Sequence, residues 1–111
     1  MKLNYVIKFV DDMERAVEFF RDVVGLPLKF ASPGWNEFAT GETTLALHPA
    51  SQKNPGGTVE LGFTVPDLDK FHVEMTAKGT RFTMPPTKQD FGGVLAQFVD
   101  SEGGRCSVAG Q

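Results

Sequence analysis

Apolar and polar positions follow two different periods along this chain, first that of a strand and then that of a helix. Residues 3–10 are mostly apolar and read as a strand, and between 13 and 24 apolar residues recur three and four positions apart. Gly25 and Pro27 follow, a pair that ends helices. The pattern therefore predicts a strand followed by one amphipathic helix.

The junction between the two carries a helix-start signal. Asp11 stands where an N-cap belongs, and Glu14 follows three positions later, which predicts a capping box. The phrase that begins at Val10 returns fifty-five positions later in the phrase that begins at Val65, again between a strand-like and a helix-like run. A repeat of this length is typical of a duplicated structural unit.

The rest of each unit reads as short strands. After the first helix come three strand-like runs at 28–32, 36–40 and 43–48, and then a breaker-rich linker over 49–57. The second unit repeats the order with a strand at 58–65, a helix at 67–78 and strands at 81–84, 94–99 and 104–109. The loop over 85–93 is long enough to carry function.

The predicted fold class is α+β, built from two βαβββ modules. One domain spans 1–111, with module one at 1–48, the linker at 49–57 and module two at 58–111. If the modules close on each other, the inward positions of their first strands, Tyr5 and Glu60, share one cavity.

Strand parity predicts which side chains see that cavity. In the strand at 58–65 the alternate apolar residues from Val59 to Val65 belong beneath the helix, so Glu60 lies on the opposite face. The same rule places Lys8 toward the first helix, where the sequence offers no reason for a lysine. The cavity face is predicted to carry Tyr5, Ile7, Phe9, Thr44, Ala46, His48, Glu60, Gly62, Thr64, Arg105 and Ser107.

Composition narrows the function classes. The 111 residues carry a formal charge of −3 and no basic run that could follow a phosphate backbone, which argues against a nucleic-acid partner. The single cysteine, Cys106, cannot form an internal disulfide, and no segment approaches the ~18 apolar residues of a membrane span. We expect a cytoplasmic protein with no membrane partner.

Two phrases carry a family resemblance. The stretch from Asp11 to Leu26 and the closing stretch from Phe98 to Arg105 resemble those of the vicinal oxygen chelate superfamily, which includes glyoxalase I, extradiol dioxygenases, and bleomycin and fosfomycin resistance proteins. The resemblance implies a cup-shaped, mixed eight-stranded sheet with helices on its outer face, and a homodimer. Metalloenzymes of the family hold a divalent ion at four positions, which here are Tyr5, Ala46, Glu60 and Ser107.

Glu60 and His48 are the candidate reactive groups. Glu60 could orient a cationic ligand or act as a general base, and its alternative role is a salt bridge to Arg105 or Lys8. His48, at the end of its strand beside Pro49, is either a ligand-binding residue or a solvated one.

Aromatic residues are the candidate pocket walls. Tyr5 replaces the histidine that relatives often have, and it could contact a ligand or form part of the core. Trp35 and Phe91 lie in turn-like segments, where they could line a pocket or contact a second chain.

The leading hypothesis is a metal-free, dimeric protein that binds a small aromatic or antibiotic-like molecule and needs no cofactor. The predicted ligand-binding residues are Tyr5, Ile7, Phe9, Trp35, His48, Glu60, Phe91 and Ser107. The alternatives are a divalent-metal-dependent lyase or isomerase of the glyoxalase type, with Glu60 and His48 as metal ligands and Glu60 as catalytic base, and a dimeric scaffold without a ligand.

Overall fold

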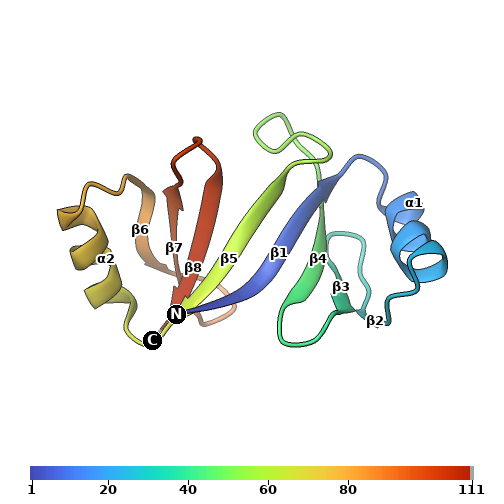
Figure 1. Cartoon of the computed structure of the whole chain (residues 1–111), viewed down its shortest axis with the longest axis horizontal. Coiled ribbons are helices and arrows are strands. Elements are labelled where there is room, and N and C mark those ends of the chain that lie inside the picture. The colour runs from blue at the N-terminus through green and yellow to red at the C-terminus, as the bar shows by residue number, and fades with distance from the viewer. Residues whose placement is uncertain (111) are drawn as a thin grey trace. The chain divides into compact units, whose positions relative to one another are not determined.

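The computed structural model describes residues 1–110, and within them eight strands and two helices form two βαβββ modules (Figure 1). The α+β class predicted from the sequence is confirmed. The chain divides into two compact units: a first unit, residues 4–59, and a second unit, residues 1–3 with 60 onward. Each unit is described by itself. No helix within residues 1–110 is long and apolar enough to cross a bilayer.

The first unit is a four-stranded mixed sheet with a helix on one face. Its elements are β1 (Lys2–Val10), α1 (Met13–Glu18) with a following π-helical turn η1 (Phe19–Val23), β2 (Leu28–Phe30), β3 (Asn36–Ala39) and β4 (Thr44–Pro49). The strand order is β2-β3-β4-β1, in which β1 runs parallel to β4 and the other pairs are antiparallel.

Register separates the two faces of this sheet. Val6 pairs with Leu45, which pairs with Phe38, so these three share the face against the helical segment. The ring of Phe20 packs there against the fully buried Phe38, with centroids 6.0 Å apart. Ile7, Ala46 and Glu37, one position along in each strand, share the opposite face.

The second unit repeats this architecture. It contains β5 (Val59–Val65), α2 (Leu68–Ala77), β6 (Phe82–Lys88), β7 (Val94–Val99) and β8 (Arg105–Gly110), in the strand order β5-β8-β7-β6. Its core is one buried cluster of Val65, Leu68, Ala96, Phe98, Cys106 and Val108. Cys106 therefore lies in the core.

Gly110 allows α2 to begin directly against the sheet. A Cβ atom at this position would lie 2.8 Å from the carbonyl oxygen of Val65 and 2.9 Å from the Cβ of Leu68. A larger side chain would push the first turn of α2 away from β8.

The predicted start of the first helix was wrong by one residue. The N-cap is Asp12, whose backbone is extended (φ −130°) and whose carboxylate accepts from the amide of Arg15 at 3.1 Å. Asp67 caps α2 in the same way, accepting from the amide of Lys70 at 3.0 Å. Asp12 and Asp67 are equivalent in the repeat, so the repeat pointed to the correct residue where the capping-box pattern did not.

The predicted loop over 85–93 was also partly wrong. β6 continues through Pro85 and Pro86 to Lys88, with register shifts against β7. Proline cannot donate to a strand ladder, but β6 is the outer strand of its unit, where one side needs no partner. The connection is therefore reduced to residues 89–93.

Candidate functional site

The face of the first unit opposite its helix carries an aromatic cluster, formed by Tyr5, Phe9, Trp35 and His48. Tyr5 and Phe9 come from β1, His48 from the end of β4, and Trp35 directly precedes β3. Ring centroids are 5.8 Å apart for Tyr5 and Trp35, 6.3 Å for Trp35 and His48, and 5.6 Å for Phe9 and His48, all edge-to-face. Four predicted site residues are therefore neighbours.

Strand alternation together with the observed pairing explains why Tyr5, Phe9 and His48 share a face. Tyr5, Ile7 and Phe9 alternate along β1, and Phe9 pairs directly with His48. Ile7 pairs with Ala46, whose side chain is fully buried. Strand parity thus predicted this face correctly.

Glu37 lies within the aromatic cluster and was missed from the sequence. Its Oε2 accepts from the indole Nε1 of Trp35 at 2.7 Å, and its Oε1 lies 3.8 Å from the Nζ of Lys29. Burial raises the pKa of the Tyr5 phenol, and the charge and hydrogen bond of Glu37 raise it further. The spacing of Trp35 and Glu37, two apart at the start of a strand, was the available signal.

His48 has a defined tautomer. Its Nδ1 lies 2.9 Å from the carbonyl oxygen of Pro49, which can only accept, so Nδ1 carries the proton in the neutral ring. Nε2 is then the acceptor, on an exposed side chain. The aromatic cluster therefore offers a phenol hydroxyl, an imidazole acceptor and a carboxylate among ring edges.

The second unit presents a polar group on the face opposite α2. Glu60 Oε1 lies 3.0 Å from Nε of Arg105, with the two side chains 10% and 28% exposed. Nη1 of Arg105 donates to Oε1 of Gln97 at 3.4 Å. The buried Ser107 pairs with Gly62 on β5 and with Gln97 on β7, so it belongs to the same face.

The predicted site residues thus fall into two groups. Tyr5, Ile7, Phe9, Trp35 and His48 belong to the first unit, whereas Glu60, Phe91 and Ser107 belong to the second. Phe91 is exposed in the 89–93 connection. That the two groups line one shared cavity stays a prediction, and Glu60 has the salt bridge to Arg105 that was its alternative role.

The residues at the four positions that the family resemblance marks for a metal do not fit a divalent ion. Ala46 has no donor atom, and the raised pKa of Tyr5 keeps its phenol protonated at neutral pH. The Glu60 carboxylate is held by Arg105. Metal sites with an open position need about three protein ligands, and within residues 1–110 no three His, Cys, Asp or Glu side chains are grouped to hold an ion.

Comparison with known proteins agrees with the topology. A curated relative is the uncharacterized protein YraH of Bacillus subtilis, 27% identical over 121 residues, with 92% of each chain covered. A solved protein structure from Legionella pneumophila is described as an NAD-dependent benzaldehyde dehydrogenase. Its sequence is 24% identical to this chain and its TM-score is 0.77, over 96% of this chain and 97% of that one.

The methylmalonyl-CoA epimerase of Mycobacterium tuberculosis is 18% identical with a TM-score of 0.72, over 97% of this chain and 86% of that one. At these identities the two solved structures show a shared fold alone. The profile of the Glyoxalase/Bleomycin resistance protein/Dioxygenase superfamily matches residues 2–106, which is nearly the whole chain. This chain therefore belongs to the Glyoxalase/Bleomycin resistance protein/Dioxygenase superfamily.

Proposed function

We propose that this protein binds a small organic molecule with a planar ring at the aromatic cluster of its first unit, and that it does so without a catalytic metal. The observation that carries the proposal is the pair of edge-to-face contacts that Trp35 makes with Tyr5 and with His48. Rings in such pairs prefer offset or edge-on partners, each worth about 1 kcal/mol beyond burial.

Polar groups around the cluster define what kind of ring fits. Glu37 accepts from Trp35 with one oxygen, its other oxygen is 3.8 Å from Lys29, and the carboxylate also has a hydrogen bond with Tyr5. A carboxylate has about four acceptor sites, so a ring that carries a hydrogen-bond donor or a positive charge could use one that Trp35 and Tyr5 leave, and Nε2 of His48 is a further acceptor. The proposal therefore favours aromatic donors and aromatic cations over aromatic acids at this cluster.

The fluorescence of Trp35 tests this proposal directly, because Trp35 is the only tryptophan in the chain. Aromatic cations, antibiotics and 2-oxo compounds are titrated while its emission and the melting temperature are followed. A bound ligand at a hundredfold excess over Kd should stabilise the protein by about 2.7 kcal/mol. His48→Gln and Glu37→Gln should weaken binding, whereas His72→Gln on α2 should not.

Treatment with a chelator tests the proposal that binding needs no metal. The same titration and melting curves are recorded after EDTA treatment and again with added nickel, zinc or manganese. We expect unchanged affinity and melting temperature. A stoichiometric ion in protein purified without chelators, or binding that EDTA abolishes, would overturn the proposal in favour of the metal-dependent lyase or isomerase.

A further inference from the structure

A second pocket lies on the other side of β1, between that strand and the helical segment α1–η1. Its volume is about 450 Å³, within the range of small-molecule sites. Lys8, Phe9 and Val10 of β1 all line it, although the ring of Phe9 also packs against His48 in the aromatic cluster. We call it the helix-side pocket. Apart from Phe9, none of its lining residues belongs to the aromatic cluster, so it is a different site from the proposed ligand site.

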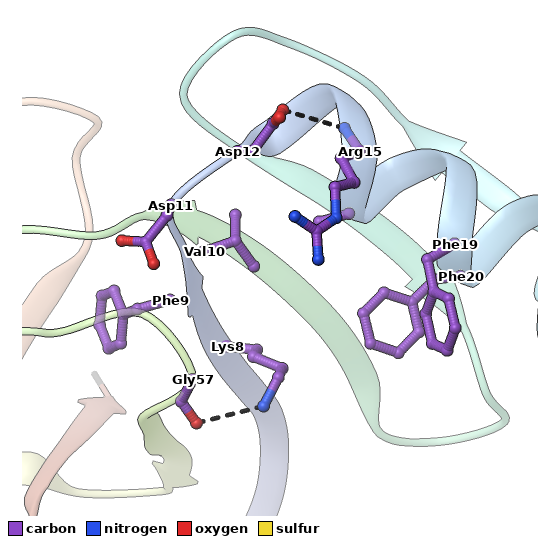
Figure 2. Close-up of a pocket in the computed structure, with 10 residues that line it drawn as sticks. Lys8, Phe9, Val10, Asp11, Asp12, Arg15, Phe19, Phe20 and Gly57 are labelled. Carbon is purple, nitrogen blue, oxygen red and sulfur yellow. Dashed lines mark hydrogen bonds between the residues drawn. The ribbon is translucent and has the colours of Figure 1, made fainter.

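Two cationic side chains reach into the helix-side pocket. Figure 2 shows the guanidinium of Arg15 descending from α1 between the phenyl rings and β1, and the ammonium of Lys8 below it. Nζ of Lys8 donates to the carbonyl oxygen of Gly57 at 3.2 Å, which leaves two of its three donors. Across residues 1–110, no carboxylate lies within 4.0 Å of either cation.

The two carboxylates that line the pocket do not contact its cations. Asp12 is the N-cap of α1 and accepts from the amide of Arg15. Asp11 is turned away from the phenyl rings (Figure 2), toward Gly56, where a Cβ atom would lie 2.2 Å from its Oδ2. Neither carboxylate neutralises the two cations through a direct ion pair.

The opposite wall is aromatic. The rings of Phe19 and Phe20 lie edge-to-face, with centroids 5.3 Å apart and an interplanar angle of 83°. Phe19 is half exposed, although burial of a phenyl ring is favourable. A ligand with an aromatic ring would cover this surface.

We propose that the helix-side pocket is a second binding site, for an organic anion that joins a carboxylate to an aromatic ring. The carboxylate would accept hydrogen bonds from Arg15 and Lys8, and the ring would pack against Phe19 and Phe20. Lys8, which had no explanation at the sequence level, is a specificity-determining residue of this site. The ligand class differs in charge from the one proposed for the aromatic cluster.

The probe for this site is 2-naphthoate, with the neutral 2-naphthamide as its matched control. Binding is followed by ¹H–¹⁵N correlation spectra of the full chain. We expect 2-naphthoate to shift the amides between Lys8 and Phe20 and to bind about tenfold more tightly than the amide, since charge-assisted hydrogen bonds are the stronger ones. Added salt should weaken the binding.

Charge-removing variants identify the cations. Arg15→Gln and Lys8→Met should each weaken 2-naphthoate binding about tenfold. The matched controls Arg81→Gln and Lys53→Met remove exposed charges outside the pocket and should leave it unchanged. Arg15 is exposed, so its variant should fold even if Lys8→Met does not.

Three results would overturn the proposal: no binding at millimolar 2-naphthoate, equal binding of the amide, or affinity that Arg15→Gln leaves intact. His48→Gln separates the two sites, because it should weaken ligands of the aromatic cluster and leave 2-naphthoate binding unchanged. Shifts confined to Trp35 and His48 would assign the probe to that cluster and reject the helix-side pocket.

Discussion

At the scale of single residues, the environment of Tyr5 makes a pH prediction. Burial is the larger cause of its raised pKa and the negative Glu37 the smaller one, so folding favours the neutral phenol over the phenolate. The stabilisation is fully present below pH 10.0, the usual phenol value, and is lost as the pH rises through the higher pKa of the folded state. Absorbance at 295 nm reports this group alone, because Tyr5 is the only tyrosine.

Glu37→Gln tests how much Glu37 contributes to the raised pKa of Tyr5. It removes the negative charge beside the phenol, so the titration midpoint should move down toward that of the urea-unfolded chain without reaching it, since burial remains. Asp69→Asn, an exposed change on α2, should leave the midpoint where it was. A folded-state midpoint at or below the unfolded one would contradict this account of Tyr5.

The Glu60–Arg105 pair makes a stability prediction. Glu60 is nearly buried, so Arg105→Met would leave its carboxylate without the guanidinium that holds it. We expect a loss of about 3 kcal/mol in the free energy of unfolding, measured by urea denaturation. Adding Glu60→Met should restore much of that loss, because the double variant buries no unpaired charge.

The exposed pair of Arg21 and Asp22 is the control for this measurement. Its atoms are 2.8 Å apart, but both side chains are about half exposed and solvent screens their attraction, so Arg21→Met should cost much less stability than Arg105→Met. Equal losses for Arg21→Met and Arg105→Met would mean that burial of Glu60 does not matter.

The sequence predicted which face of the sheet a side chain lies on better than it predicted which groups that side chain contacts. Alternation along a strand placed Tyr5, Phe9 and His48 together, because side-chain direction has a fixed period of two. It missed Glu37, although the spacing of Trp35 and Glu37 was visible, because the place of Glu37 beside Ala46 depends on the pairing of β3 with β4, which the local pattern does not contain. For Glu60, the pattern gave the correct face but left open whether a ligand or Arg105 would meet it.

At the scale of secondary-structure elements, the two helix caps make matched predictions. Asp12→Ala and Asp67→Ala should each lower the free energy of unfolding by about 1 kcal/mol, because each removes the acceptor for an amide of the first turn. Asp11→Ala is the natural control, since Asp11 directly precedes the cap and accepts from no helix amide. A larger loss for Asp11 than for Asp12 would restore the capping box expected from the sequence.

Element order was easier to predict than element ends. Strand and helix periods identified all ten expected elements, because burial imposes those periods over many residues. Where an element begins or ends depends on local detail. The start of α1 depends on which of two adjacent aspartates has an extended backbone, and the end of β6 depends on whether Pro85 and Pro86 lie on an outer or an inner strand. The position of β6 at the edge of its unit is a property of the whole sheet, and the sequence of the strand does not encode it.

At the scale of the whole molecule, the repeat was the most informative signal. It predicted two βαβββ modules because equivalent phrases precede equivalent helices, and the caps Asp12 and Asp67 show that this equivalence extends to single hydrogen bonds. The ligand could not be predicted in the same way. The rings of the first unit and the ion pair of the second are side-chain arrangements that the two modules do not share.

The homodimer implied by the family remains a prediction, and the surface of the first unit supplies a test of it. Large apolar side chains are at least half exposed in the segment from Val23 to Phe30, among them Val23 at 73%. Association that covers them would be favourable. We expect light scattering to give twice the mass of one chain, with a melting temperature that rises with protein concentration.

Serine substitutions test which surface forms the predicted dimer contact. Val23→Ser with Phe30→Ser should shift the protein toward the monomer, because both side chains would lose the apolar surface that a second chain covers. Val73→Ser is the matched control, since Val73 on α2 is similarly exposed, at 67%, but lies in the other unit. If Val73→Ser dissociates the dimer and the first pair does not, the contact belongs to the second unit, and a monomeric mass at every concentration would reject the dimer altogether.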